Sequence, residues 1–344
     1  AIGTGNTMYT PVPGMMEVRQ AACGRYAHKE GLRLAPAQVV VSNGAKECLY
    51  NAFQVILNPG DEVIIISPYW LTYPEQVKMA GGVPVFAQAK EENDFEPALA
   101  DLEKAVSERT RAIIVNNPSN PCGNLYSRHS LEEIAGFAKA HDLYIISDEI
   151  YDELVYGKEA ISIATLSEDA LERTIIINGA SKAYAMTGWR IGYTAGPTEV
   201  IKAMSSLQSQ VASGSNSIAQ YAAEEALRSP KGPEEIERMH KAYDERRRHI
   251  VSRLNAIDGL KCVMPKGAFY VMVDMSALIG KHLGDRKLAG SMDFADMLLE
   301  NANVALPPGT AFCAEGYCRM SYATAMEQID KGVDRIEHFV NSLV

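Results

Sequence analysis

The chain has 344 residues, of which 47% are hydrophobic and 22% are charged, so it is long enough for about two domains with substantial cores. Its apolar runs all fall short of the roughly 18 residues that a membrane-spanning helix needs, and we expect no contact with a membrane. The formal net charge of −10 and the isoelectric point near 5.3 argue against nucleic acid or an anionic membrane as the main partner, since both attract basic proteins.

The six cysteines are scattered along the chain without Cys-x-x-Cys pairs. They are Cys23, Cys48, Cys122, Cys262, Cys313 and Cys318. No histidine stands near them at a spacing typical of a metal site, so we expect reduced thiols in a cytoplasmic protein. Cys313 and Cys318 could form at most a weak metal pair, and no metal site is predicted.

Between residues 38 and 178 the chain alternates short runs of apolar β-branched residues with helical patterns. The predicted strands are VVVS at 39–42, EVIIIS at 62–67, VPVFA at 83–87, RAIIVNN at 111–117, LYIISD at 143–148 and TIIIN at 174–178. Most are apolar on both faces, as expected for strands covered by helices on both sides. A helix is predicted over 45–57, before the stop signal NPGD. This alternation predicts an α/β fold with a mostly parallel sheet.

After about Pro230 the pattern changes to that of a second, α+β unit. A long charged helix is predicted over 232–257, followed by short strands around GAFYVMV and CRMSYA and a closing helix from about Met326. The charges between residues 234 and 253 fit the solvent-facing side of that helix better than a nucleic-acid site. We therefore predict a large domain over residues 12–232 and a smaller domain made of residues 1–11 and 233–344.

The carboxyl ends of the predicted strands carry polar and aromatic side chains, and such sheets place their chemistry at these ends. The first strand leads to Gly44, Ala45 and Lys46, where the backbone N–H groups and the dipole of a starting helix would suit a phosphate. The second leads to Trp70, which is either a stacking surface or a core aromatic. The fourth leads to NNPSNPCGN, a turn that presents Asn120.

The last two strand ends add the charged groups. The fifth strand ends at Asp148, with Tyr151 three residues later, and the sixth leads to Ser181, Lys182 and Arg190. Carboxylates and lysines are seldom buried without a partner, so Asp148 and Lys182 could simply pair with each other. The whole set contains a phosphate seat, a stacking ring, a carboxylate, polar donors, a lysine and an arginine. Such a set is typical of a pyridoxal phosphate (PLP) pocket.

Seven segments in chain order resemble the class I aminotransferases of PLP fold type I, and especially the bacterial aspartate and aspartate/prephenate aminotransferases. The segments are SNGAKECLYNAF, SPYWLTYPEQVKMAGG, NNPSNPCGNLY, SDEIYDELVYG, SKAYAMTGWRIGY, GAFYVMVD and CRMSYA. The resemblance implies a homodimer with shared active sites. It also implies transfer of an amino group to 2-oxoglutarate from an amino acid, with aspartate or another acidic amino acid expected as the donor.

The resemblance assigns a role to each residue that would contact the cofactor ring. Lys182 would form a Schiff base with the cofactor aldehyde, and Asp148 would pair with the pyridine nitrogen. Tyr151 and Asn120 would bond to the ring hydroxyl oxygen, and Trp70 would stack on the ring.

The resemblance also assigns the phosphate and the substrate. The phosphate would be held by Ser181, Arg190 and the backbone of residues 44–46, and Tyr9 in GNTMYTPVPG would reach it from the partner subunit. Arg319 in CRMSYA would clamp the substrate α-carboxylate, with Asn120 and Trp70 also contacting the substrate. Lys46 would help to receive a distal carboxylate, unless it is simply a solvated lysine near the phosphate.

Two features depart from the family pattern. Many members carry a hydroxyl residue where this chain has Gly179, which removes one possible phosphate donor. Members also begin earlier, with an N-terminal arm, a loop that closes over the substrate and often an arginine that completes substrate recognition. We therefore expect a further segment to precede Ala1.

Other functions on the same fold stay open from the sequence. They are an aromatic, alanine or kynurenine-type aminotransferase and a cysteine-S-conjugate β-lyase. A different class, the aminotransferase-like sensor domain of a transcription regulator, would need a basic DNA-binding segment, and none is present in these 344 residues.

Overall fold

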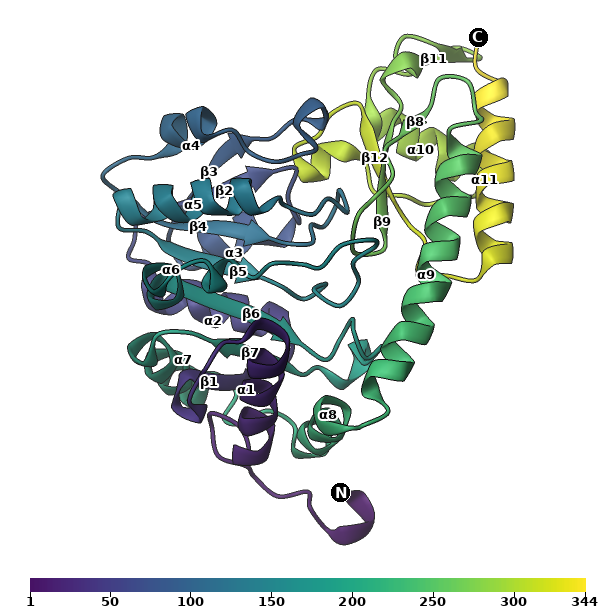
Figure 1. Ribbon diagram of the computed structural model, residues 1–344. Coiled ribbons are helices and arrows are strands. Elements are labelled where there is room, and N and C mark those ends of the chain that lie inside the picture. The colour runs from purple at the N-terminus through teal and green to yellow at the C-terminus, as the bar shows by residue number, and fades with distance from the viewer.

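The structure is a computed structural model that describes residues 1–344. Figure 1 shows a larger unit built on a broad sheet and a smaller unit beside it, connected by the long helix α9 (Gly232–Leu254). None of the helices combines the length and the apolar character needed to cross a membrane.

A seven-stranded sheet forms the centre of the larger unit. Its strands are β1 (Val39–Ser42), β2 (Glu62–Ser67), β3 (Val83–Gln88), β4 (Thr110–Asn116), β5 (Tyr144–Asp148), β6 (Thr174–Gly179) and β7 (Gly192–Ala195). They lie in the order β1-β7-β6-β5-β4-β2-β3. β7 runs in the direction opposite to that of the other six strands. The six predicted strands all form within a residue or so of their predicted bounds, so the prediction of a mostly parallel α/β sheet is confirmed.

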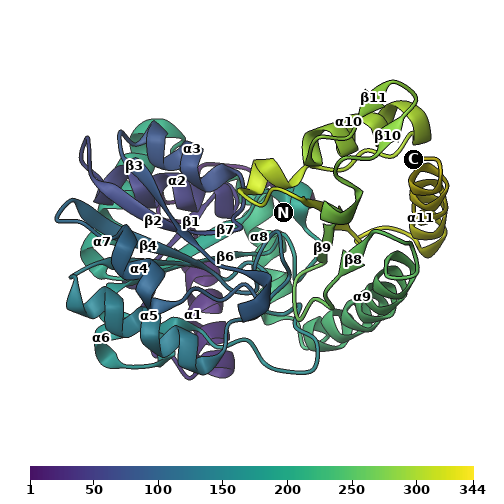
Figure 2. The ribbon, with the colours of Figure 1, turned by 90° about the horizontal axis from the view of Figure 1, so that it is seen from above.

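Helices cover both faces of this sheet (Figure 2). They are α1 (Met16–Glu30), α2 (Ala45–Ile56), α3 (Thr72–Met79), α4 (Leu99–Ala105), α5 (Arg128–Ala140), α6 (Glu168–Arg173), α7 (Thr198–Val211) and α8 (Ser217–Arg228). On one face α2, α3 and α7 pack against alternate strand residues such as Val63 and Ile65. On the other face α1, α4, α5 and α8 pack against the intervening residues, including Ile64 and Ile113. This alternation explains why the strand runs are apolar throughout.

Two strands differ from what the sequence indicated. β7 was not predicted, because it has only four residues and its Gly192 and Thr194 give it little apolar β-branched character. β3 lies at the edge of the sheet, where Val83 and Phe86 are 42% and 43% exposed. The helices α3 and α4 pack on its two faces, so the exposure of these side chains comes from the edge position, where β3 has a neighbouring strand on one side only.

The smaller unit has its own sheet and a core cluster that also takes in residues 150–156 of the larger unit. The sheet has the order β12-β9-β8, formed by β8 (Lys261–Cys262), β9 (Tyr270–Asp274) and β12 (Tyr317–Ser321). The other elements are α10 (Ser291–Ala302), α11 (Met326–Asn341) and the short hairpin β10 (His282–Leu283) and β11 (Arg286–Lys287). Residues of α9, α10 and α11, among them Leu254, Phe294 and Phe339, pack against this sheet. The predicted division into domains near residue 232, with residues 1–11 in the smaller one, stays a prediction.

Apolar packing of Ile150, Tyr151 and Leu154 against the smaller unit and several polar contacts join the two units beside the end of the large sheet. Lys261 of the smaller unit pairs with Glu91 of the larger one, and Lys266 pairs with Asp94. The hydroxyl of Tyr317 donates to Glu91 at 2.9 Å. Exposed ion pairs contribute little stability individually, so the buried apolar packing is the stronger connection between the units.

Candidate active site

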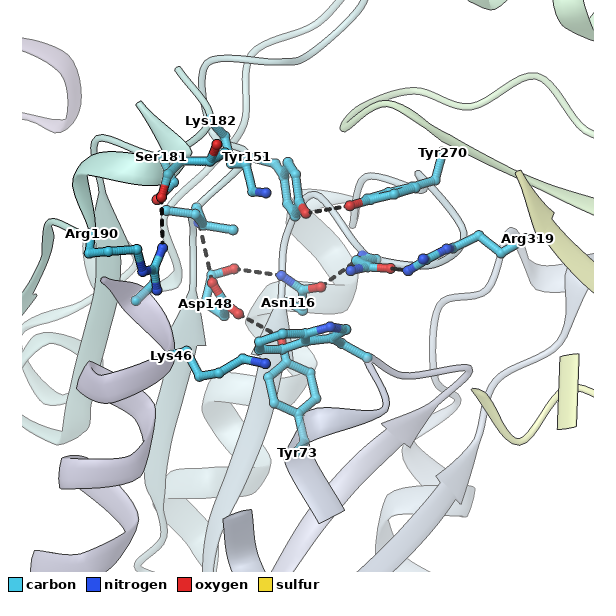
Figure 3. Close-up of a pocket in the computed structure, with 15 residues that line it drawn as sticks. Lys46, Tyr73, Asn116, Asp148, Tyr151, Ser181, Lys182, Arg190, Tyr270 and Arg319 are labelled. Atoms are coloured by element: carbon cyan, nitrogen blue, oxygen red, sulfur yellow. Dashed lines mark hydrogen bonds between the residues drawn. The ribbon is translucent and has the colours of Figure 1, made fainter. Parts of the chain in front are cut away.

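A cavity of about 260 Å³ lies at the carboxyl end of the large sheet, where the smaller unit faces it. Figure 3 shows Ser181, Lys182 and Arg190 on one side of this cavity, Tyr270 and Arg319 on the other, and Asp148 between them. Ten of the residues singled out from the sequence line it: Ala45, Lys46, Trp70, Asn120, Asp148, Tyr151, Ser181, Lys182, Arg190 and Arg319. The strand ends that the sequence pointed to therefore do meet at one place.

At the end of the cavity nearest α2, the Arg190 guanidinium lies close to the start of this helix. Gly44 precedes the first residue of α2 with a φ of 90°, a left-handed conformation that favours glycine. A Cβ at this position would collide with the Arg190 guanidinium. That guanidinium donates to the Thr187 carbonyl at 3.0 Å and to the Asn43 carbonyl at 3.3 Å. Because the first N–H groups of a helix have no partner within the helix, an arginine and a helix start together form an anion site.

Gly179, the departure from the family pattern, has a structural cause close to this site. A Cβ on Gly179 would lie 2.6 Å from the carbonyl oxygen of Ile191. Real Cβ atoms do not approach a backbone oxygen so closely, so a hydroxyl residue would require β6 and the segment before β7 to separate. The glycine thus belongs to the packing of this strand pair.

The carboxylate of Asp148 is buried and has few polar partners. It is 3% exposed and accepts hydrogen bonds from the Tyr73 hydroxyl at 2.7 Å and from the Ile150 N–H at 3.3 Å. Burial raises the pKa of Asp148 to about 6, although these hydrogen bonds and the charge of Lys182 act in the opposite direction. A carboxylate held this way favours a cationic partner on the cavity side.

Lys182 lies in the same cavity but forms no salt bridge with Asp148, so the simple pairing of these two residues is not seen. Its Nζ lies 5.8 Å from the ring centre of Tyr151 and 5.5 Å from that of Phe269. Burial, followed by the charge of Arg190, lowers the pKa of Lys182 below its ordinary value, while Asp148 opposes this shift. The amine is thereby brought closer to the neutral state that a nucleophile or base needs.

A chain of hydrogen bonds connects Asp148 with Arg319 across the two units (Figure 3). The Asn116 side chain donates to the Asp148 carbonyl at 2.9 Å, and its own Oδ1 accepts from the Asn120 N–H at 2.8 Å. The Asn120 Oδ1 in turn accepts from Arg319 at 2.8 Å. The Arg319 guanidinium also lies 4.6 Å from the ring centre of Tyr270. These contacts fix the arginine while leaving most of its N–H groups for a ligand.

The charge of the cavity is opposite to that of the whole chain. Lys46, Lys182, Arg190 and Arg319 line it together with the single carboxylate of Asp148, and none of the four cations forms a salt bridge. The Nζ of Lys46 lies instead 4.8 Å from the ring centre of Trp70. Cations without counter-ions in a protein of net charge −10 indicate a site for an anionic ligand.

Some residues lie elsewhere than the sequence suggested, and others were missed. Tyr9 is 97% exposed on the N-terminal segment and does not line the cavity of its own chain. Tyr73, Asn116, Ile150, Thr187 and Tyr270 line the cavity but were not predicted to do so. Asn116 is the last residue of β4, and this position at the end of a predicted strand was the sequence signal that could have identified it.

No group of three or more histidine, cysteine, aspartate or glutamate side chains in the structure could hold a metal ion. All six cysteines are free, with Cys313 exposed and Cys318 buried.

Comparison with known proteins agrees with this geometry. A family model described as aminotransferase class I and II matches residues 1–336. The chain belongs to this family. The aspartate aminotransferase of Bacillus sp. (strain YM-2) is 45% identical over 98% of this chain and 84% of its own length. The aspartate/prephenate aminotransferase of Thermus thermophilus is 43% identical over 97% of this chain and 84% of its own length.

Solved structures show the same relationship. The aspartate aminotransferase from Rhizobium meliloti superposes with a TM-score of 0.97 at 37% identity, covering all of this chain and 86% of that one. The aspartate aminotransferase from Thermus thermophilus with maleate gives a TM-score of 0.92 at 43% identity, covering 98% of this chain and 85% of that one. The protein is thus a PLP-dependent aminotransferase of fold type I, as the sequence predicted.

The residues present fit PLP. The cofactor carries a phosphate, a pyridine nitrogen and an aldehyde. The cavity offers an anion site at Gly44 and Arg190, a buried carboxylate at Asp148 and a lysine of lowered pKa at Lys182.

Proposed function

We propose that this aminotransferase moves the amino group of an acidic amino acid, with aspartate as the main donor, to 2-oxoglutarate. The observation that carries the proposal is the charge of the cavity. Four cations face one carboxylate there, and none of the cations is neutralised by the chain itself. A PLP phosphate and the two carboxylates of a dicarboxylic substrate would each find a cationic partner.

PLP, when bound, supplies an electron sink that makes loss of a Cα proton feasible. Asp148 would hold the pyridine nitrogen, because an ionised carboxylate favours the protonated form of a nearby ring nitrogen. Arg190, Ser181 and the backbone of residues 44–46 would hold the phosphate. Trp70 would cover the ring, while Tyr151 and Asn120 would bond to its hydroxyl oxygen.

Lys182 would be the point of covalent attachment and then the base that takes the proton from Cα. Its lowered pKa supports this role, since a general base must be free of its own proton near neutral pH. The Lys182 amine lies near the aromatic rings of Tyr151 and Phe269, and these rings contribute to the burial that lowers its pKa.

Arg319 would bind the α-carboxylate of the substrate. A guanidinium offers two parallel N–H groups that match a carboxylate, and lysine cannot do this. Its hydrogen bond to Asn120 and its place beside Tyr270 fix the plane of the guanidinium. A fixed plane would orient the Cα–H bond of the substrate as well as contribute affinity.

The preference for an acidic donor rests on Lys46. Its amine lies over Trp70 at the cavity wall and pairs with no carboxylate of the chain, so it can receive the distal carboxylate of a substrate. One similar structure is that of an aspartate aminotransferase with maleate, a dicarboxylate, which supports this assignment.

A second candidate is an aromatic aminotransferase. The aromatic aminotransferase from Pyrococcus horikoshii superposes with a TM-score of 0.93 at 38% identity, covering 99% of this chain and 89% of that one. Trp70 and Tyr270 also give the cavity aromatic walls on which an aromatic side chain could pack.

We also propose that the enzyme works as a homodimer in which Tyr9 of one copy reaches the phosphate site of the other. The support is the exposure of the N-terminal segment, which projects from the larger unit in Figure 1 and carries Met8 and Tyr9 at 79% and 97% exposure. Large apolar and aromatic side chains so fully exposed on a projecting segment are typical of a contact with another chain.

Single-turnover spectroscopy of the PLP-loaded enzyme with a panel of amino acids tests the substrate assignment. Each productive donor converts the aldehyde form of the cofactor to the amine form, which changes the visible absorbance. Faster conversion by aspartate and glutamate than by phenylalanine and tyrosine is expected. Faster conversion by the aromatic donors would favour the second candidate. Release of a thiol, pyruvate and ammonia from a cysteine S-conjugate, with no 2-oxo acid acceptor added, would indicate a β-lyase.

A further inference from the structure

Tyr73 is a buried cavity residue to which the proposed chemistry assigns no role. It stands in the first turn of α3, is 1% exposed and lines the cavity below Asp148 (Figure 3). Its hydroxyl donates to the Asp148 Oδ2 at 2.7 Å. Its ring meets that of Trp70 edge-on, with 5.4 Å between the ring centres. One side chain thus contacts both the carboxylate and the stacking ring.

The hydroxyl of Tyr73 is one of only two protein donors to this carboxylate. The other is the Ile150 N–H at the longer distance of 3.3 Å. Removing a donor from a buried carboxylate leaves an oxygen without a partner, which disfavours the ionised form. The hydroxyl also stays a donor at all working pH values, because burial and then the charge of Asp148 hold the pKa of Tyr73 well above its ordinary value.

The other titratable groups around Asp148 act more weakly or through space. Lys182 lies in the cavity and favours the ionised carboxylate. Tyr151 and Cys48 face it from the segment after β5 and from α2, and burial raises the pKa of both groups. Both are therefore neutral near pH 7 and do not replace the contribution of Tyr73.

We propose that Tyr73 is a positioning residue that keeps Asp148 ionised and oriented to receive the pyridine nitrogen of PLP. The inference rests on the role that the proposed function gives to Asp148. The ring of Tyr73 extends from α3 into the core cluster that includes residues of α2, and this packing would hold its hydroxyl, and with it the carboxylate, in place. Tyr73 itself contacts no reacting atom.

Equilibrium binding of PLP to the full-length apoenzyme, measured across pH for the wild type and Tyr73→Phe, tests this role. Phenylalanine keeps the ring against Trp70 and removes only the hydroxyl. Without that donor, the pKa of Asp148 is expected to rise by about one unit above its value of about 6. Above that pKa the ionised carboxylate binds the cofactor, and below it the protonated form binds more weakly.

The change in PLP affinity at each pH decides whether the inference holds. A one-unit shift weakens PLP binding by about fivefold at about pH 6 and by less than about twofold at about pH 8. The ratio of the variant and wild-type Kd values at each pH removes the titration of free PLP, which is common to both measurements. A loss of equal size at every pH, or no loss, would overturn the inference.

Two further variants show whether the effect is specific to Tyr73 and whether it acts through Asp148. Tyr193→Phe removes the hydroxyl of another fully buried tyrosine, whose oxygen has no hydrogen-bond partner, and should leave the Kd ratio near one at every pH. In the Asp148→Asn background, Tyr73→Phe should cause no additional pH-dependent loss. If Asp148→Asn itself left PLP binding unchanged, the proposed function would fail. If only Tyr73→Phe were silent, the positioning role alone would fail.

Discussion

Replacing Arg319 with lysine is expected to lower kcat/KM for amino acid donors by about 30- to 150-fold. Lysine keeps the positive charge but loses the planar pair of N–H groups and the hydrogen bond that now runs to Asn120 at 2.8 Å. The lost interaction with the substrate is one charge-assisted hydrogen bond, which contributes about 2–3 kcal/mol. At about 1.36 kcal/mol for each factor of ten, this gives the stated range.

The assay is single-turnover conversion of the PLP-loaded enzyme by aspartate, with the observed rate followed against donor concentration. A separate measurement of PLP affinity should show little change, because Arg319 is assigned to the substrate. Arg253→Lys is the matched control. Arg253 connects α9 with Asp330 and Asp334 of α11 and does not line the cavity, so its replacement should leave kcat/KM unchanged.

The reasoning about Arg319 would be refuted if Arg319→Lys retained wild-type kcat/KM while binding PLP normally. It would also be refuted if the substitution slowed the reaction of an amine without an α-carboxylate as strongly as it slowed that of aspartate. The first result would mean that another cation of the cavity holds the α-carboxylate, and the second would mean that Arg319 serves the cofactor.

Three other substitutions test the remaining assignments. Lys182→Ala is expected to abolish turnover and the visible absorbance of covalently held cofactor, while PLP still binds noncovalently in equilibrium dialysis. Residual turnover near the wild-type level would contradict the assignment of Lys182 as the base. Lys46→Ala should lower kcat/KM for aspartate by about 5- to 30-fold, as expected for loss of about 1–2 kcal/mol from one partly buried ion pair, and change it by less than about twofold for phenylalanine. An equal loss for both donors would place Lys46 with the phosphate. Tyr9→Phe should weaken PLP binding by about fivefold through loss of one hydrogen bond of about 1 kcal/mol. Sedimentation velocity should show that the enzyme is a dimer. A monomer with unchanged PLP affinity would exclude a shared site.

Much of the large sheet could be predicted because its strands are buried on both faces. Runs such as Ile64–Ile66 and Ile175–Ile177 must be apolar at every position, and this pattern differs from the periodicity of a helix. β7 escaped prediction because its four residues, Gly-Tyr-Thr-Ala, form no apolar β-branched run, and its place in the sheet is set by its pairing with β1 and β6. Such a strand is defined by its neighbours in space, which a single sequence does not display.

The candidate site likewise contains residues that could be placed from the sequence and residues that could not. Asp148 and Lys182 could be placed because they stand at or just after the ends of buried strands, and the carboxyl ends of such strands are where α/β sheets bind their ligands. The role of Arg190, which stands just before β7, came from the resemblance of its segment to the family. Tyr73 and Tyr270 could not be placed, since their orientation depends on where α3 begins and on how the smaller unit faces the sheet. Tyr9 lies outside the cavity of its own chain, so its role depends on a second copy.

The hydrogen-bonded series from Asp148 through Asn116 and Asn120 to Arg319 has a consequence for how new specificities could arise. Asn120 bonds to Arg319 and is also proposed to hold the cofactor hydroxyl, so exchanging its side chain to alter the substrate is expected to weaken the retention of vitamin B6 as well. Lys46 has no such ties, because its amine rests on Trp70 without a hydrogen bond to the rest of the chain. Laboratory evolution toward other amino acids should therefore begin at Lys46 and leave the asparagines untouched.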